Sequence, residues 1–216
     1  MSKLLRPHPW HGIELYDSRE EKILNAYIEI VPSDTVKYEL DKKTGYLKVD
    51  RPQRFSNIIP ALYGFLPQTY SGKNVAEYSI ERLGRNSLKG DMDPLDICVL
   101  TEKNVIHGDL IVNAIPIGGF RMIDHGEVDD KIIAVLKDDA VFGELRDIKH
   151  CPDGTLSRLK HYFLTYKQIP DPDTDEVAKC EITHIYGHEE AIEVIECGEA
   201  DYHGKYNYQK LESSVK

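Results

Sequence analysis

Polar and apolar residues alternate most regularly at residues 36–41. Apolar side chains stand at every second position there, and charged side chains such as Lys37 and Glu39 stand between them. The Thr-Gly pair at 44–45 is typical of a turn, and residues 46–51 follow as a returning strand. The pattern predicts a β-hairpin with one packed face and one charged face. The simplest interpretation of its charged face is contact with solvent.

Other segments show the apolar runs of strands or the spacing of helices. An apolar residue recurs at helical spacing in residues 155–167, and a shorter helix is expected at 188–197, ended by Gly198. The strand at 109–119 contains Pro116, where we expect it to bend or end. Further strands are expected at 24–31, 96–101, 132–136 and 179–186.

Three segments carry little regular pattern. Residues 1–20 are expected to be irregular, 67–90 form a long polar insertion read as a loop, and the tail from about 199 to 216 is polar. We find no internal repeat and no composition shift that marks a boundary, so residues 1–216 are expected to form a single domain.

Composition excludes several classes of function. The net charge of −10 argues against a nucleic-acid partner, and no apolar run is long enough to span a membrane. The N-terminus lacks the apolar segment of a signal peptide, and the four cysteines form no CxxC pair. We therefore expect a cytoplasmic protein with reduced cysteines.

Two acidic segments lead into apolar strands. Asp91, Asp93 and Asp96 fall within six residues around a proline, and Asp124 and Asp129 flank a second turn. Carboxylates brought together in one place would repel each other unless cations such as Mg²⁺ were bound between them. The alternative is that the two segments lie apart as solvated surface loops. Within the second segment, Asp129 and Lys131 should point to one side of an extended chain and Asp130 to the other.

Two other groups of potential metal ligands are rejected. Asp171, Asp173 and Asp175 have the spacing of a calcium loop but lack its glycine, and His8 and His11 stand without a nearby cysteine or acidic cluster. We interpret the first group as a solvated turn and the two histidines as packing or solvent contacts.

Basic residues provide the charge that matches the acids. Lys37, Arg51, Lys131 and Lys167 come from separate predicted elements. Metals facing lysine and arginine side chains would suit transfer of a phosphoryl group to water. Lys167 also fits the end of a helix, and Tyr166 fits a core-facing position. Spacing alone does not identify the phosphate compound.

The run Gly90-Asp91-Met92-Asp93-Pro94-Leu95-Asp96 resembles the signature of soluble family I inorganic pyrophosphatases. The similarity extends in order and approximate spacing from about residue 24 to 167, and includes 36–41, Tyr63-Gly64 and 122–131. It implies an α+β, mainly β fold: a small closed barrel of OB type with helices packed outside. It also implies hydrolysis of pyrophosphate to two orthophosphates with Mg²⁺, or with Mn²⁺ in its place, by a homo-oligomer of unspecified subunit number.

The resemblance also implies roles for individual residues. Asp91, Asp96 and Asp129 would ligate the principal metal, Asp96 would also hold a second, and Asp124 with Asp129 would hold one that arrives with the substrate. Glu29 and Glu39 would act through metal-bound water, and Asp93 would deprotonate the attacking water shared by two metals. The two phosphates would be bound by Lys37, Arg51, Tyr63, Lys131, Tyr166 and Lys167.

The chain departs from the family pattern in three places. Ile59 stands where many members have a tyrosine at the edge of the site, and Met92 replaces a small residue in the signature. The 67–90 insertion and the extended ends make the chain longer than the compact bacterial members. Two other functions remain open at this stage: a metal-dependent phosphatase of broader specificity, and an inactive barrel that binds anions or a protein.

Overall fold

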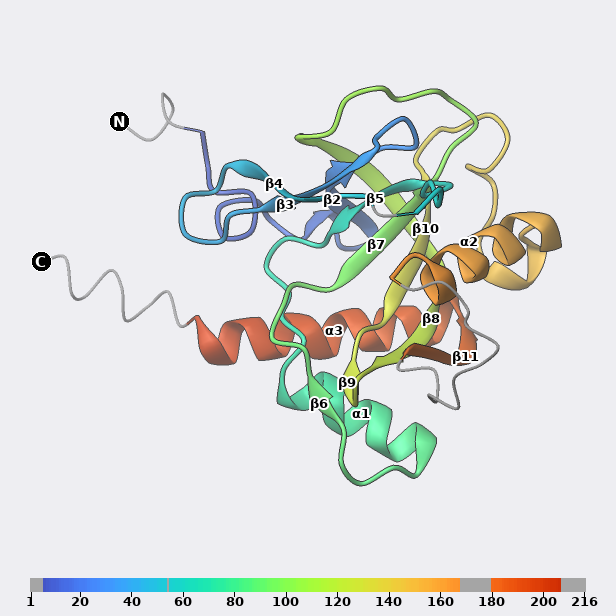
Figure 1. The fold of residues 1–216 in the computed structure, drawn as a ribbon. Helices are drawn as coiled ribbons and strands as arrows, with labels where there is room; N and C mark the ends of the chain where they lie inside the picture. Colours follow the sequence, from blue (N-terminus) through green and yellow to red (C-terminus); the bar gives the residue numbers. More distant parts are fainter. Residues whose placement is uncertain (1–5, 54, 168–179, 207–216) are drawn as a thin grey trace, which may run out of the picture.

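Five strands close into a barrel at the centre of the fold (Figure 1). The structure, a computed structural model, describes residues 6–53, 55–167 and 180–206. Hydrogen bonds join β2 to β5, β7, β10 and β8 in turn, and β8 pairs with β2 to complete the ring. The predicted closed barrel is therefore confirmed. Its strands are β2 (Ile23–Ile30), β5 (Leu62–Phe65), β7 (Asp96–Leu100), β8 (Leu110–Asp124) and β10 (Lys131–Leu136).

The predicted hairpin is confirmed as a separate two-stranded sheet. It consists of β3 (Val36–Leu40) and β4 (Leu47–Pro52), which are antiparallel and pair Lys37 with Arg51. Short strands extend the main sheet beyond the barrel: β1 (Tyr16–Ser18) pairs with β2, β6 (Lys89–Gly90) with β9 (Glu127–Val128), and β11 (Cys180–Gly187) with β8.

Three helices lie outside the barrel, namely α1 (Lys73–Leu83), α2 (Asp153–Thr165) and α3 (His188–Lys205) (Figure 1). The strands are covered on both sides, which explains why their sequences are apolar runs. In β10, Ile132 belongs to the cluster that includes Val194 of α3, whereas Ile133 belongs to the cluster that includes Phe163 of α2. The helix predicted at 155–167 is confirmed, with its beginning and end two residues earlier. No helix of the described residues is long and apolar enough to cross a membrane.

The prediction of a loop at 67–90 is wrong, because α1 occupies the middle of that segment. Its buried residues are Val75, Ala76 and Ser79. Ala76 and Ser79 are small, and Ser79 is also polar. Such a stripe buries one side of the helix without the strong apolar periodicity that predicts a helix from sequence.

The expected end of the last helix at Gly198 is also wrong, because α3 continues to Lys205. The region from 199, expected to be a polar tail, is helical as far as the structure describes it. Gly198 packs so closely against Leu95 that an added Cβ would lie 2.5 Å from Leu95 Cδ1. The glycine therefore permits a close approach of the helix to the barrel and does not end the helix.

Pro116 does not end its strand. Ile133 pairs with Gly118 and Ala134 pairs with Pro116, so Ile117 is the extra residue of a β-bulge. The bulge accommodates the proline, and β8 runs on to Asp124, past the end at residue 119 that we expected.

The N-terminal segment contains one short strand and otherwise packs by its aromatic residues. Trp10 is 2% exposed, and its indole N–H donates to the carbonyl of Thr69 at 2.8 Å. His11 stacks on Trp10 with ring centroids 4.6 Å apart. Packing is therefore confirmed for this histidine. The acidic turn predicted at 171–175 lies outside the described residues.

Candidate active site

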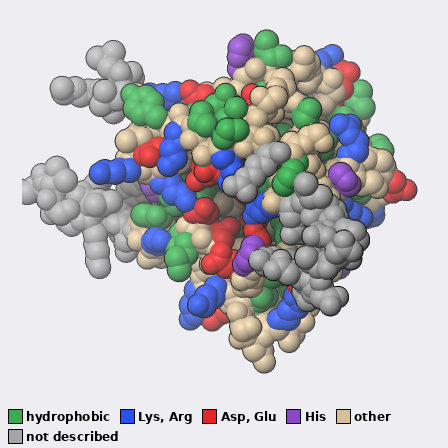
Figure 2. All heavy atoms as spheres, in the orientation of Figure 1, with side chains coloured by type: hydrophobic (Ala, Val, Ile, Leu, Met, Phe, Trp, Pro, Cys, Tyr) green, Lys and Arg blue, Asp and Glu red, His purple; other side chains and the backbone are tan. Residues whose placement is uncertain are grey.

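A cavity of about 310 Å³ opens where β7 and β10 begin and β8 ends. Figure 2 shows acidic side chains at the centre of one face of the molecule with basic side chains around them. All thirteen residues that the sequence analysis assigned to the site line this cavity: Glu29, Lys37, Glu39, Arg51, Tyr63, Asp91, Asp93, Asp96, Asp124, Asp129, Lys131, Tyr166 and Lys167. The two acidic segments therefore converge, and the alternative of separate surface loops is wrong.

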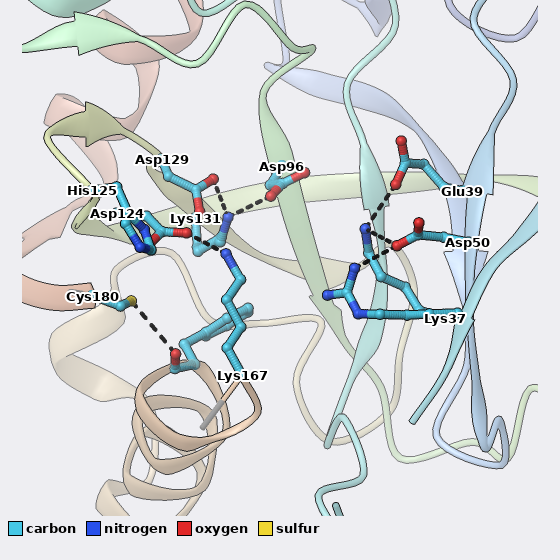
Figure 3. A network of polar contacts seen from close by, with 12 residues as sticks. Lys37, Glu39, Asp50, Asp96, Asp124, His125, Asp129, Lys131, Lys167 and Cys180 are labelled. Carbon is cyan, nitrogen blue, oxygen red and sulfur yellow. Dashed lines mark hydrogen bonds and ion pairs between the residues drawn. The ribbon is translucent and has the colours of Figure 1, made fainter. Parts of the chain in front are cut away.

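The parallel pairing of β7 and β10 brings the two acidic segments together. Lys131 and Asp96, the first residues of these strands, stand directly opposite each other in the register. The side chain of Lys131 is 1% exposed, and its Nζ donates to carboxylate oxygens of both Asp96 and Asp129 (Figure 3). The Tyr63 hydroxyl also donates to Asp96, at 2.5 Å. One buried ammonium group thus holds two of the predicted metal ligands.

Asp130 faces the other way, as its alternating position predicted. Its carboxylate is buried, accepts a hydrogen bond from the Tyr186 hydroxyl at 3.0 Å and lies 3.5 Å from a guanidinium nitrogen of Arg121. Burial raises the pKa of Asp130 to about 6, against the opposing effect of Arg121. The contacts of Asp130 with Tyr186 and Arg121 hold the side of this segment that faces away from Asp129 and Lys131.

The hairpin forms the wall opposite the acidic segments (Figure 3). Lys37 Nζ donates to Glu39 at 2.8 Å and lies 3.1 Å from Asp50, whose carboxylate also accepts from Arg51 at 2.6 Å. The bulge between Lys37 and Tyr38 lets Lys37 and Arg51 pair across the two strands. The positive charges of Lys37 and Arg51 therefore lie together at the cavity. This arrangement corrects the interpretation of the charged face of the hairpin as a surface in contact with solvent only.

The signature loop bends back on itself at Met92. Met92 has φ 67°, a left-handed conformation that costs a residue with a side chain about 1 kcal/mol or more, and its side chain is exposed. The Asp93 N–H donates to Asp91 at 2.9 Å, and the Asp93 carboxylate accepts from Lys42 on the hairpin turn. The conformation explains why a small residue is favoured at this position, and the exposure explains why methionine fits.

The end of α2 provides the remaining basic side. Tyr166 is the residue at which the helix ends, and Lys167 follows it and pairs with Asp124 (Figure 3). Asp124 also accepts from the ring of His125, at 2.6 Å. Tyr166 contacts the apolar cluster of α2 and lines the cavity, so it fits both interpretations made from the sequence.

Burial perturbs the carboxyl groups of the cavity in a consistent direction. Burial raises the pKa of Glu29 to about 8, although its carboxylate accepts the Leu40 N–H at 2.6 Å. Burial raises the pKa of Asp91 to about 8 with a further contribution from the charge of Asp129, and burial likewise raises the pKa of Asp129. Asp124 differs, because burial is outweighed by the ion pair with Lys167 and the hydrogen bond with His125, which lower its pKa. Glu29, Asp91 and Asp129 thus have too little positive charge around them to offset the effect of burial on their pKa values.

The donor set suits a hard divalent cation. Eight carboxyl side chains line the cavity against five lysine and arginine side chains, so the lining is acidic in sum. Among the residues that the structure describes, no three acidic, histidine or cysteine groups are already placed to hold an ion. Lys131 instead occupies oxygens of Asp96 and Asp129. Oxygen donors with raised pKa values would gain most from a cation such as Mg²⁺.

Three charged residues of this region were missed by the sequence analysis. Lys42 contacts Asp93, Asp50 bridges Lys37 and Arg51, and Glu127 lines the cavity. Asp50 could have been found from its position beside Arg51 in the predicted strand. Ile59, which was noted for its missing hydroxyl, is 2% exposed and packs in the core near α2.

The fold and the cavity together define a class of protein: an enzyme with a small closed barrel that acts on a phosphate compound. The sequence profile described as inorganic pyrophosphatase matches residues 26–203. The chain belongs to the inorganic pyrophosphatase family, which confirms the resemblance found in the sequence.

Individual relatives cover nearly the whole chain. An inorganic pyrophosphatase of Chlamydia caviae is 54% identical over 204 residues, which are 94% of each chain. The inorganic pyrophosphatase of Helicobacter pylori has a solved structure with a TM-score of 0.69 and 31% identity, and the match covers 88% of this chain and 98% of that one. A type I inorganic pyrophosphatase of P. falciparum gives a TM-score of 0.74 at 27% identity, over 96% of this chain and 67% of that one.

Proposed function

We propose that this chain is a hydrolase that cleaves inorganic pyrophosphate to two orthophosphates with Mg²⁺ as its cofactor. The observation that carries the proposal is the meeting of two oppositely charged walls in one cavity. Buried carboxylates with raised pKa values form one wall, and Lys37 and Arg51 stand on the other. Membership in the inorganic pyrophosphatase family selects pyrophosphate from the phosphate compounds that such a cavity would suit.

The residues present fit a divalent metal. Asp91, Asp96 and Asp129 would hold the principal ion, with Asp96 shared by a second and Asp124 contributing to an ion that enters with the substrate. Glu29 and Glu39 would complete the acidic lining through water. When bound, Mg²⁺ would neutralise phosphate oxygens and acidify the attacking water. Mn²⁺, which also prefers oxygen donors, would serve in its place.

The remaining residues bind the substrate and move a proton. Asp93 is placed in the loop between Asp91 and Asp96, where its carboxylate would accept the proton of the attacking water. Lys42 pairs with this carboxylate. The phosphate groups would be held by Lys37, Arg51, Tyr63, Lys131, Tyr166 and Lys167. The positive charges of the lysine and arginine side chains among them would stabilise the departing phosphate.

A phosphate-release assay with pyrophosphate, with and without Mg²⁺, tests the proposal. Asp93→Asn should keep the fold and metal binding but lower kcat by about 10²- to 10⁴-fold, as expected for loss of a general base. Asp138→Asn, at an exposed aspartate with 82% side-chain exposure, is the control and should leave turnover unchanged. Near-normal turnover of Asp93→Asn would remove it from this role.

The assay also separates the two other functions. Comparable rates on sugar phosphates or nucleotides would indicate a broader phosphatase, and absence of turnover on every substrate would indicate a binding protein. We further propose a single domain spanning residues 1–216, assembly into a homo-oligomer and a cytoplasmic location. We also propose that the chain has no nucleic-acid partner, which the net charge of −10 supports.

A further inference from the structure

Ser71 is a buried residue at the start of the inserted segment whose purpose the sequence left open. It is 3% exposed and directly precedes Gly72, the N-cap residue of α1. In Figure 1, α1 lies beside β6 and β9, which flank the two acidic segments in the chain. The insertion therefore lies next to the strands that lead into the two acidic segments.

Every polar atom of Ser71 contacts the residues around the predicted metal ligands. Its backbone N–H donates to the Asp93 carbonyl at 2.7 Å, and its carbonyl accepts the Met92 N–H at 3.1 Å. Its hydroxyl accepts the Asp91 N–H at 3.3 Å and donates to the Val128 carbonyl at 3.2 Å. Since Val128 precedes Asp129, a single hydroxyl joins the backbones of both acidic segments.

Close packing fixes the distance between Ser71 and the signature loop. A Cβ added to Gly90 would lie 2.1 Å from the Ser71 carbonyl oxygen, so only glycine allows the two backbones to approach this closely. Gly90 directly precedes Asp91. The contact of Ser71 with the loop is therefore built into the packing of both segments.

The start of α1 is held in turn by the last helix. Gly72 has no side chain to cap α1, and Asp201 of α3 takes that role. Its carboxylate accepts the N–H groups of Gly72 at 3.0 Å, Asn74 at 2.9 Å and Val75 at 3.1 Å. Asp201 is 9% exposed, and a buried carboxylate that accepts several backbone N–H groups at a helix start is held firmly. Ser71 is thus anchored from outside the barrel.

We propose that Ser71 is a positioning residue for the acidic site, and that Asp201 and α1 hold it there. Its hydroxyl sets the spacing between Asp91 and Asp129, which come from different segments and must converge on one cation. The inference rests on the proposed function, because it assumes that these two aspartates ligate the metal. The proposal assigns a role to the inserted helix: α1 holds Ser71 in contact with the two acidic segments of the site.

The test compares Ser71→Ala with Ser79→Ala. Ser79 is a second buried serine, in α1 itself, and its hydroxyl has no hydrogen-bond partner among the described residues. Each variant loses one buried hydroxyl, so a general effect of the substitution would appear in both. Binding of Mg²⁺ and of Mn²⁺ without substrate is measured by calorimetry, alongside kcat, KM and the melting temperature of each variant.

Ser71→Ala should bind Mg²⁺ about 10- to 100-fold more weakly than wild type, the usual effect of removing a group that orients metal ligands. The KM for pyrophosphate at saturating Mg²⁺ should change little, because the substitution leaves Lys37 and Arg51 of the hairpin unchanged. Ser79→Ala should match wild type in metal binding. Metal affinity of Ser71→Ala within about twofold of that of Ser79→Ala would overturn the inference.

A second variant keeps the test decisive if Ser71→Ala does not fold. Asp201→Asn removes the charge that caps α1 and one of its two acceptors, and it should weaken Mg²⁺ binding in the same direction. Unchanged binding in that variant would overturn the inference. Failure of the proposed function is recognised separately: the wild-type chain would then release no phosphate from pyrophosphate with Mg²⁺, whatever the behaviour of Ser71→Ala.

Discussion

Replacing Lys131 by methionine would remove the one charge shared by Asp96 and Asp129 while keeping most of the side-chain volume. Lys131 Nζ contacts a carboxylate oxygen of each, and the lysine side chain is 1% exposed. The charges of Asp129 and Asp96 outweigh burial and raise the pKa of Lys131 well above its usual range, so the group is charged at neutral pH. In the absence of divalent cations the variant would therefore leave two adjacent carboxylates without the ammonium group that contacts both of them.

The expected loss follows from the burial of the three groups. Removing one partner of a fully buried ion pair costs about 3–5 kcal/mol, since the remaining charge stays desolvated. The Asp96 side chain is 24% exposed and that of Asp129 is 14% exposed, so water screens part of the loss and the lower end, about 3 kcal/mol, applies. For a chain of this size each kcal/mol lowers Tm by about 2–4 °C, which gives a decrease of about 6–12 °C.

Thermal unfolding followed by circular dichroism in EDTA, and then with increasing Mg²⁺, measures this effect. Mg²⁺ bound by Asp96 and Asp129 would supply the positive charge that the variant lacks. It should therefore stabilise the variant more than wild type and narrow the difference between their melting temperatures. Lys137→Met is the control at the other end of β10. Its lysine is 37% exposed and pairs with the exposed Asp138, so the melting temperature should stay near that of wild type. Equal melting temperatures of the two variants in EDTA would refute the reasoning.

Three further perturbations test other parts of the molecule. Arg51→Ala should raise the KM for pyrophosphate while Mg²⁺ binding stays near wild type, because its guanidinium pairs with Asp50 on the basic wall; unchanged initial-rate kinetics would count against this. Arg121→Met should lower the free energy of unfolding by about 3–5 kcal/mol, because Asp130 would stay buried without its cation, and the further change Asp130→Leu should restore much of it in urea unfolding. Asp139→Asn should cost roughly 2 kcal/mol at neutral pH, because hydrogen bonds outweigh burial and lower the pKa of Asp139 to about 2. This contribution is present above the unfolded pKa near 4 and is lost as the pH falls towards 2, so the difference between Asp139→Asn and wild type should shrink over that range; a constant difference would contradict it.

Local patterns made part of the fold predictable. The alternation at residues 36–41 depends only on neighbouring positions, and β3 and β4 formed where it indicated. The acidic segments were also visible in the sequence, but their convergence was not. It depends on the parallel register that sets Lys131 against Asp96, and the two residues are 35 positions apart. Only the family resemblance provided that information before the structure.

The features that escaped prediction depend on contacts between distant segments. The start of α1 is capped by Asp201, 129 residues after Gly72, so no local capping residue marks it. Gly198 looks like the end of a helix until its close contact with Leu95 is known. Lys42 was missed because its approach to Asp93 requires the folded hairpin.

The side-by-side start of β7 and β10 also determines where the chain can change in length. Segments that leave the other ends of these strands, at 101–109 and 137–147, meet the barrel away from the paired Asp96 and Lys131. Insertions there would leave the acid and the lysine on the same rung. One residue added between Asp129 and Lys131 would instead put the Asp129 carboxylate and the Lys131 ammonium group on opposite sides of the extended chain. Insertions and deletions should therefore be tolerated where β7 and β10 end. The ends where these strands begin, at Asp96 and Lys131, tolerate no shift in register.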